Sequence, residues 1–297
     1  MRARTDWRAQ WRVATLAPAL CVYLLLALLP IVNLLAMSVH DIRWDQGVAH
    51  WTFTGLQHFA AMPADPLVRA GALNTVLFAI LAVSAEMVLG LFLALLVSRV
   101  ARGRVVYRTI FLLPMLIPGI VIGAIWKLMY NADFGVINQL LRLVGLTGYD
   151  WLGDGTLAFA SVVLVDVWHW TPFVFLLLLA GIESLPQDVH ESARIDGAGA
   201  WQEFRHVTFP MLLPTFVVTL AFRLIVSFKV FDEVYLLTGG GPGTATEVIS
   251  FTIYRRFFTE DRMGYGSAIS VVVLFVLSLL IVTWMAAAKR RERGMLA

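Results

Sequence analysis

An acidic side chain, an imidazole and two aromatic rings recur at helical spacing within one apolar stretch of the chain. Asp166, His169, Trp170 and Phe173 stand at positions i, i+3, i+4 and i+7, so they share one face of a helix. Aromatic rings stack on the C–H faces of sugars, while a carboxylate and an imidazole form hydrogen bonds with hydroxyl groups. The face therefore predicts a pocket for a polyhydroxylated solute, with ordinary packing of the aromatic rings as the alternative.

The stretch that positions this face is one of six long apolar runs. The 297 residues are 59% hydrophobic and 14% charged, whereas soluble domains are about 45–50% apolar. Each run is long enough to cross a hydrocarbon core, which needs about 20 helical residues. We therefore expect an all-α polytopic membrane protein with six transmembrane helices. The predicted spans are 13–39, 72–97, 105–129, 157–182, 211–237 and 267–288.

Basic residues are distributed unevenly between the segments that join these spans. The segments on the side of the two termini carry 14 Lys and Arg residues, and those on the other side carry 7. Because Lys and Arg accumulate on the cytoplasmic side, both termini and the 183–210 loop are predicted to be cytoplasmic. The first run follows four arginines, as in a signal peptide, but its 27 residues are too long for one, so we expect an uncleaved first span.

Several classes of protein lack support in the sequence. Cys21 is the only cysteine, which rules out an intrachain disulfide. His169 has no second His or Cys at ligand spacing, so no metal site is predicted. There is no phosphate-binding loop, no nucleophile motif, and no basic run interleaved with aromatic residues, so neither an enzyme nor a nucleic-acid partner is expected. Any energy source must come from another chain.

The 183–210 loop is predicted to form two short helices joined at a glycine. Ser184 and Gln187 have the spacing of a capping box, which predicts a helix that starts near Ser184. Gly197 offers a backbone that can turn before a second apolar stripe begins. Pro210 biases the preceding residue away from helical geometry and is expected to end the unit. A helical pair on the membrane surface is the alternative.

The same loop carries the residues of a family resemblance. Its pattern is Glu191-Ser192-Ala193, three residues, Gly197, nine residues, and Val207, Phe209 and Pro210. This resembles the Glu-Ala-Ala, Gly, Ile-x-Leu-Pro loop in the permease subunits of bacterial binding-protein-dependent ABC importers, with Ser, Val and Phe as mild departures. Asp196-Gly197-Ala198 and the glycine-rich 238–242 are similar to the branch that includes maltose and other sugar permeases. The resemblance covers nearly the whole chain.

The resemblance implies a single transmembrane permease domain over residues 1–297, in the bacterial cytoplasmic (inner) membrane. The implied partners are a second permease subunit, two ATPase subunits, an extracytoplasmic solute-binding protein, and a sugar or polyol solute. ATP and Mg would be bound by the ATPases, so this chain would need no cofactor and would itself be no enzyme. Coupling to the ATPases is implied for five loop residues, Glu191, Ser192, Ala193, Asp196 and Gly197.

The resemblance also extends the predicted solute pathway to a second helix. The positions Asp166, His169, Trp170 and Phe173 match sugar-facing positions of the family. In the fifth span the matching positions are Arg223, Val226, Ser227 and Val230, which again share one helical face. If that span is helical to Leu237, Asp166 lies level with the turn at Lys229–Val230.

Other charged residues in the spans are predicted to be structural. Because an ionisable group is costly at mid-membrane, we expect Glu86 to pair within the bundle. Local ion pairs are expected among Lys229, Asp232 and Glu233, which fall within one helical turn.

Two features of the loops opposite the 183–210 loop are informative. Phe134, Ile137, Leu141 and Val144 fall on one helical face, which predicts either an interfacial helix or a cover over the ends of the spans. The glycines and proline of 238–242 preclude a continued helix. By resemblance, these loops face the solute-binding protein.

An ion-coupled secondary transporter is the rival interpretation. Asp166, Arg223 and Glu86 within the membrane motivate it. Such transporters commonly have two related halves, and this sequence has no internal repeat. A membrane enzyme is a third interpretation, and no nucleophile–base arrangement favours it.

Overall fold

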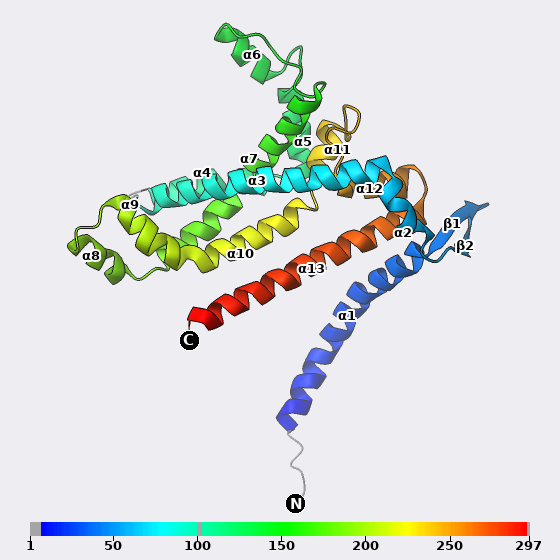
Figure 1. Ribbon diagram of the computed structural model, residues 1–297, viewed down its shortest axis with the longest axis horizontal. Coiled ribbons are helices and arrows are strands. Elements are labelled where there is room, and N and C mark those ends of the chain that lie inside the picture. The colour runs from blue at the N-terminus through cyan, green and yellow to red at the C-terminus, as the bar shows by residue number, and fades with distance from the viewer. Residues whose placement is uncertain (1–6, 100–102, 296–297) are drawn as a thin grey trace, which may run out of the picture. The chain divides into compact units, whose positions relative to one another are not determined.

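The computed structural model describes residues 7–99 and 103–295, which are mostly helical (Figure 1). Within these ranges, five helical segments are long and apolar enough to cross a membrane. This agrees with the predicted polytopic helical fold. The N-terminal arginines Arg2 and Arg4 lie outside the described residues. The long helices are α1 (Trp7–Ser38), α3 (Pro66–Ser98), α7 (Gly155–Glu183), α10 (Phe209–Ser227) and α13 (Met263–Met295).

The predicted third span is broken. Helix α4 (Arg104–Leu112) is followed by a 3-10 turn (Pro114–Leu116), and α5 begins only at Gly119 and ends at Met129. The physical reason is proline: Ile117, which precedes Pro118, is extended with φ −88° and ψ 128°, the geometry that a following proline favours. The expectation of one continuous helix over 105–129 is therefore wrong.

The predicted fifth span ends ten residues early. Helix α10 stops at Ser227, and a separate short helix, α11 (Asp232–Leu237), follows a non-helical turn. The Ser227 hydroxyl donates to the Leu224 carbonyl at 2.9 Å, a bond that competes with the helical ladder. Ser250 donates to the carbonyl of Val230, which satisfies that group outside a helix. Lys229 and Val230 therefore do not continue the helical face of α10, so the expectation of a continuous helix to Leu237 is wrong, although both residues line the same cavity as Asp166.

The 183–210 loop has the predicted helical pair but different boundaries. Ser184 caps the end of α7, where its hydroxyl donates to the Gly181 carbonyl, so it does not start a helix. Helix α8 (Gln187–Ile195) begins after Pro186, and α9 (Ala200–Glu203) follows the turn at Gly197. A π-helical stretch (Phe204–Thr208) then leads directly into α10. Pro210 lies in the first turn of α10, where its missing N–H is tolerated, so it does not end the unit.

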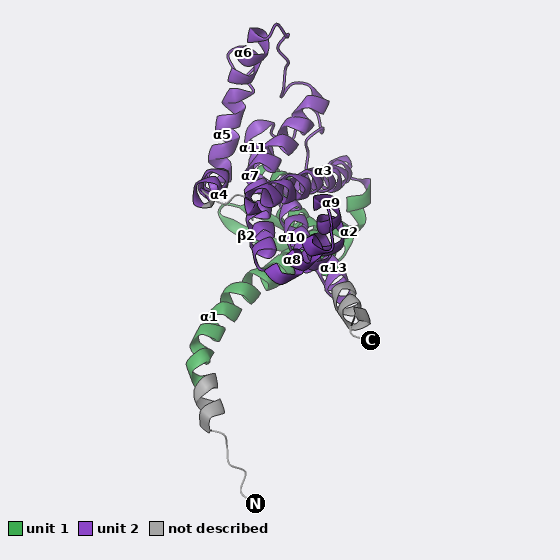
Figure 2. Ribbon diagram, turned by 90° about the vertical axis from the view of Figure 1, so that its left-hand side faces the viewer, with its two compact units in different colours: residues 1–63, 253–279 green, residues 64–252, 280–297 purple. Residues whose placement is uncertain are grey.

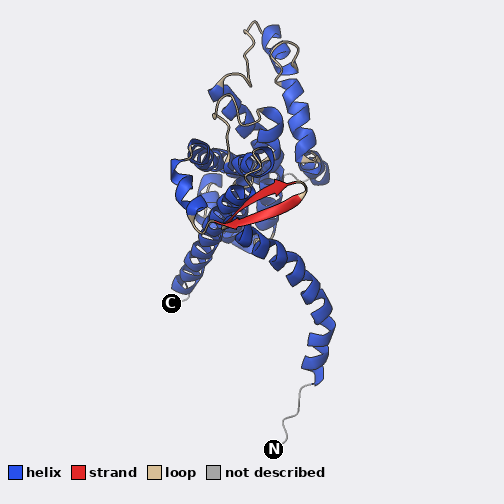
Figure 3. Ribbon diagram, turned by 90° about the vertical axis from the view of Figure 1, so that its right-hand side faces the viewer, coloured by secondary structure: helices blue, strands red, loops and turns tan. Residues whose placement is uncertain are grey.

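The segments between the spans contain a hairpin that the sequence did not predict. Strands β1 (His40–Asp45) and β2 (Val48–Phe53) pair antiparallel, with His40 opposite Phe53 (Figure 3). Gln46 and Gly47 both have positive φ, 47° and 81°, as a two-residue hairpin turn requires.

The predicted helix of the 127–156 segment is present as α6 (Val136–Leu143), and its interfacial position stays a prediction. The remaining short helices are α2 (Gln57–Ala61), a 3-10 turn (Met62–Ala64), α12 (Ile249–Tyr254) and a π-helical turn (Arg255–Thr259).

The chain forms two compact units (Figure 2). Unit 1 comprises 1–63 and 253–279, and unit 2 comprises 64–252 and 280–297. The core of unit 2 lies where α3 packs on α7 and α10. A Cβ on Gly90 of α3 would meet Val174 of α7 at 2.6 Å, so the close approach of these helices requires glycine. A single permease domain over the whole chain stays a prediction. The buried core residues are Val83, Met87, Ala94, Val97, Val174, Phe175, Leu178, Leu179 and Leu212.

Candidate functional site

Three buried charged side chains join the three core helices of unit 2. Arg223 of α10 has no exposed surface, and its Nη2 donates to Glu86 Oε1 of α3 at 2.6 Å and to Asp166 Oδ2 of α7 at 2.9 Å. Its Nε also pairs with Glu86. The predicted structural pairing of Glu86 is confirmed. Because two carboxylates surround one guanidinium, Arg223 carries no surplus positive charge toward a solute.

A polar cavity of about 400 Å³ borders this triad. Asp166 forms part of both, and the Trp170 ring lies 4.7 Å from the Arg223 guanidinium carbon, which places an aromatic face beside the buried charges. The non-helical turn after α10 forms much of the opposite wall. The lining residues are Gly119, Asp166, His169, Trp170, Val226, Lys229, Val230, Phe231, Asp232 and Glu233.

The cavity brings together five of the eight predicted pathway residues: Asp166, His169, Trp170, Val226 and Val230. The other three do not line it. Arg223 and Ser227 are buried in the core. Phe173 packs on Phe222, with ring centroids 4.7 Å apart. Helical spacing and the family resemblance predicted that these residues would line one pathway. In the structure, the break in α10 and the packing of the core separate them.

The charged residues of the turn after α10 pair differently from the prediction. The Glu233 carboxylate lies 3.3 Å from His169 Nδ1, so it bridges α11 to α7. Lys229 and Asp232 form no ion pair with the residues that the structure describes, so the predicted local pairs are wrong. The cause is again the helix break, which removes the one-turn spacing. No group of three His, Cys, Asp or Glu side chains within residues 7–99 and 103–295 is arranged to hold a metal ion.

Sequence reasoning did not predict the other five lining residues as part of the pathway: Gly119, Lys229, Phe231, Asp232 and Glu233. A Cβ on Gly119 would meet Asp232 Oδ2 at 2.8 Å, so α5 and the turn after α10 approach each other closely at this glycine. The signal in the sequence was the pair Pro118–Gly119, which marks the start of α5. Asp232, which Gly119 approaches, comes from a distant segment of the chain, and no local pattern indicates that the two segments meet.

The 183–210 loop turns at Gly197 as predicted. Gly197 has φ +79°, and the N–H of Ala198 donates to the Ala193 carbonyl at 3.0 Å while that of Gly197 donates to the Arg194 carbonyl at 3.1 Å. This is the glycine-terminated cap of a helix. An L side chain at Gly197 would be strained even though no atom lies within 4 Å of its Cβ position.

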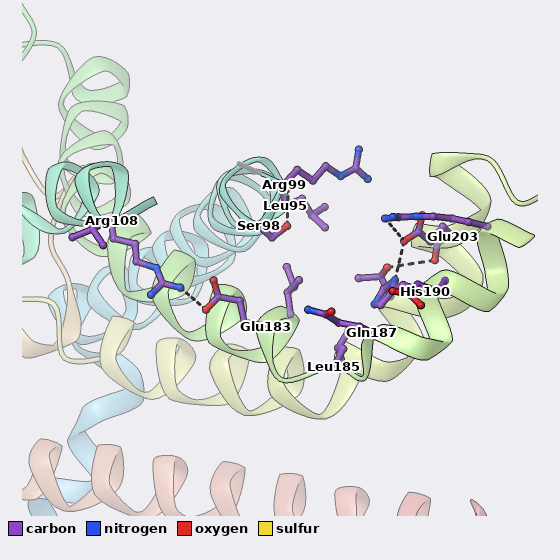
Figure 4. A pocket seen from close by; sticks show the side chains of 14 residues that line it. Leu95, Ser98, Arg99, Arg108, Glu183, Leu185, Gln187, His190 and Glu203 are labelled. Carbon is purple, nitrogen blue, oxygen red and sulfur yellow. Dashed lines mark hydrogen bonds and ion pairs between the residues drawn. The ribbon is translucent and has the colours of Figure 1, made fainter. Parts of the chain in front are cut away.

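A single carboxylate joins the two helices of this loop. Glu203 Oε1 of α9 lies 2.8 Å from His190 Nδ1 of α8, and Glu203 Oε2 accepts from Arg194 Nε at 3.4 Å (Figure 4). The Glu203 side chain is only 13% exposed and its contact with His190 is partly buried, whereas the Arg194 side chain is 68% exposed. His190 and Arg194 are four residues apart on one face of α8. The loop is therefore held as one body across its turn.

A second polar cavity, of about 600 Å³, lies between this loop and the ends of α3, α4 and α7. Arg108 and Glu183 form an ion pair in it (Figure 4). Glu191 lines this cavity, whereas Ser192, Ala193, Asp196 and Gly197 do not. The five predicted coupling residues are thus divided between the cavity and the remaining surface of the loop.

The chain is similar in sequence to several permease proteins of transport systems. The chain is 38% identical over 277 residues to the trehalose/maltose transport system permease protein MalF of Thermococcus litoralis, which covers 93% of this chain and 92% of the relative. It is 34% identical to the sulfoquinovosyl glycerol transport system permease protein SmoG of Agrobacterium fabrum, over 90% and 86% of the two chains. It is 33% identical to the probable starch degradation products permease AmyD of Thermoanaerobacterium thermosulfurigenes, over 95% of each.

The fold agrees with these relatives. A bacterial ABC transporter involved in the import of the acidic polysaccharide alginate superposes with a TM-score of 0.85 at 24% identity, covering 98% of this chain and 99% of that one. The profile of the "binding-protein-dependent transport system inner membrane component" family matches residues 86–294. The ion-coupled alternative finds no support among these matches, and permease subunits are transport components without catalysis of their own. The chain belongs to the family of inner membrane components of binding-protein-dependent transport systems.

Proposed function

We propose that this permease subunit conducts a sugar or polyol, and that it forms the pathway together with a second permease subunit. The observation that carries the proposal is the interrupted helix beside a polar cavity: the chain leaves α10 at Ser227, and residues of the following turn line the cavity with Asp166 and Trp170. Non-helical backbone at membrane depth is tolerated where it lines a water-filled cavity. Relatives named for trehalose, maltose and starch products support a saccharide.

The cavity offers the chemistry that such a solute needs. Trp170 and Phe231 supply aromatic faces, and Asp232 and Lys229 supply an acceptor and a donor that no protein ion pair occupies in the described chain. His169 is held by Glu233, which fixes its ring toward the cavity. These groups replace Arg223 and Ser227 as the expected hydrogen-bonding partners of the hydroxyl groups.

The proposal includes the rest of an importer. The 183–210 loop would contact two ATPase subunits that bind ATP and Mg, through Glu191, Ser192, Ala193, Asp196 and Gly197. An extracytoplasmic solute-binding protein would deliver the solute. A solved alginate transporter in complex with a solute-bound periplasmic protein, which shares this fold, supports that arrangement. Both termini would be cytoplasmic.

Two tryptophans on α7 provide a matched test of the pathway. Trp170 lines the polar cavity, whereas Trp168 lies outside it and packs on Trp126 with centroids 5.6 Å apart. Trp170→Ala should lower solute uptake by roughly two- to tenfold, because a stacking contact is worth about 0.5–1.5 kcal/mol. Trp168→Ala should leave uptake close to wild type. Uptake into proteoliposomes would be measured with the solute identified by thermal-shift screening of the binding protein; equal effects of the two variants would reject the pathway.

A further inference from the structure

A polar cavity of about 420 Å³ lies within unit 1, whereas all residues that line the pathway cavity belong to unit 2. It lies where the base of the β1–β2 hairpin, the start of α2 and the start of α13 come together (Figure 1). These segments belong to the loops opposite the 183–210 loop, and the predicted pathway includes none of the residues involved. The lining residues are Asp41, Ile42, Arg43, Thr54, Gln57, His58, Asp261, Arg262 and Tyr265.

The inner wall of this unit 1 cavity is closely packed. Ile42 and Tyr265 are buried. The His58 ring packs edge-on against Tyr265, and its Nε2 lies 3.2 Å from the His40 carbonyl oxygen. A Cβ on Gly264 would meet the same carbonyl oxygen at 2.0 Å, so α13 can begin this close to β1 only with glycine at that position. The cavity is therefore formed by the packing of the chain itself, and a ligand would lose little affinity to reorganisation of its wall.

Several polar groups of the lining have no partner in the described chain. Gln57, Asp261 and Arg262 are exposed, and their side chains form no hydrogen bond or ion pair with the described residues. The Arg262 guanidinium carbon lies 4.4 Å from the centre of the Tyr265 ring, which holds the guanidinium at the cavity by a cation–π contact. The hydroxyl oxygen of Thr54 is buried and also lacks a partner among the described residues. Because buried polar groups are nearly always hydrogen-bonded, this hydroxyl indicates a missing polar partner.

The backbone at the rim of the cavity is strained. Asp261 has φ +54°, in the left-handed region that few residues other than glycine adopt. The N–H of Arg262 donates to the Arg256 carbonyl at 2.9 Å, and that of Glu260 donates to the Arg255 carbonyl at 2.9 Å, so the preceding π-helical turn holds this geometry. Strained positions of this kind are concentrated at ligand sites. Here the strain keeps a carboxylate and a guanidinium side by side at the cavity.

The charges of the lining balance one another, which indicates the class of ligand. Asp41 and Arg43 form an ion pair at 3.1 Å, and Asp261 and Arg262 contribute one charge of each sign. A charged ligand would lose hydration without gaining an excess of opposite charge. A hydroxyl group, in contrast, donates and accepts at once, so it can use the guanidinium, the carboxylate and the Gln57 amide together.

We propose that the unit 1 cavity is a second binding site of the permease, for a neutral sugar or polyol. Gln57, Asp261 and Arg262 hydrogen-bond the hydroxyl groups of the ligand. Tyr265 is covered by Arg262 and contacted by His58, so hydrogen bonds rather than aromatic stacking carry the binding. The site goes beyond the proposed transport pathway and binds its ligand without the solute-binding protein.

Three matched sugars test the class of ligand. The permease complex would be embedded in nanodiscs without the solute-binding protein, and binding of glucose, glucuronate and glucosamine would be measured by saturation-transfer NMR against empty nanodiscs. The Trp170→Ala variant would be used, because it weakens binding in the pathway cavity. Glucose should bind more tightly than either charged sugar by at least about threefold. Absence of glucose binding, or equal or tighter binding of a charged sugar, would overturn the inference.

Variants at the rim locate the site. Gln57→Ala removes an exposed side chain that supports no other contact, and it should lower glucose affinity by roughly two- to tenfold. Arg262→Gln keeps a planar group beside Tyr265 and should lower glucose affinity by roughly tenfold, because a charged donor is lost. Arg69→Gln is the matched control, since Arg69 is exposed and lines neither cavity, and its glucose affinity should not change. Unchanged affinity in both rim variants would place the bound glucose elsewhere and overturn the inference.

The solute-binding protein is the competing occupant of the cavity, and amide exchange distinguishes it. Slower exchange in residues 54–58 and 261–265, but not in α6, when glucose alone is added supports the inference. Slower exchange there only when the solute-binding protein is added assigns the cavity to a protein contact and overturns it. Failure of the pathway proposal is a separate result, because the comparison of Trp170→Ala with Trp168→Ala measures uptake and involves no residue of unit 1.

Discussion

Three charged side chains pair with one another at the centre of unit 2. Arg223, Glu86 and Asp166 are each costly alone in an apolar interior, and they are tolerated because the Arg223 guanidinium pairs with both carboxylates. Residue type and depth were enough to predict that Glu86 pairs. The partner was not predictable, because Glu86 and Arg223 are 137 positions apart in the chain and meet only after α3 and α10 pack.

Removal of the cation tests this role. Arg223→Met leaves two carboxylates buried without a counter-charge, which should destabilise the subunit by about 3–5 kcal/mol. Thermal unfolding of the purified complex in detergent would measure the loss. Arg69→Met is the control, since Arg69 is exposed and forms no ion pair in the described chain, and its unfolding temperature should not change. An equally stable Arg223→Met variant would mean that the triad does not hold the helices together.

The hydrophobic runs predicted most of the long helices, but they did not predict where two of these helices break. The run over 105–129 contains Pro114 and Pro118, which separate α4 from α5. The run that ends at Leu237 contains a less visible signal, Ser227, whose hydroxyl competes with the backbone. Both breaks change which residues face the cavity. The β1–β2 hairpin was missed because an aromatic, alternating stretch was taken for a loop.

The turn of the 183–210 loop gives a prediction for one element. Gly197→Val should abolish the stimulation of ATP hydrolysis by solute while the spans still insert, because a β-branched residue at φ +79° carries about 1–3 kcal/mol of backbone strain. Gly197→Asn should retain most stimulation, since Asn tolerates this left-handed geometry. The ATPase activity of the reconstituted complex would be measured with and without the solute-loaded binding protein. Normal stimulation in the Val variant would contradict the proposed role of the turn.

At the scale of the whole chain, the basic residues predict which side each loop occupies. Helix α7 connects the segment after α6 to α8, and Figures 1 and 2 show α6 and α8 at its opposite ends. The loops at these ends should therefore lie on opposite sides of the membrane. An alkaline-phosphatase fusion after Thr147 should be active and one after Gly199 inactive. The reverse pattern would invert the topology and remove the 183–210 loop from the cytoplasmic ATPases.

The family and much of the architecture were predictable from the sequence, because the loop motif and the apolar runs are local features. It did not reach the composition of the cavity, since Gly119 and Asp232 come from separate segments that meet only in the folded chain. The same holds for partner chains, because no pattern within this chain indicates which residues a second subunit contributes. The assembled importer therefore provides the most direct test of the proposed function.

That test is the dependence of ATP hydrolysis on the solute-loaded binding protein. The chain would be purified in mild detergent with its associated subunits and reconstituted into proteoliposomes. We predict that an ATPase co-purifies, and that the loaded binding protein raises both ATP hydrolysis and solute uptake several-fold without an ion gradient. Uptake that proceeds in the absence of ATP and follows an imposed proton or sodium gradient would contradict it.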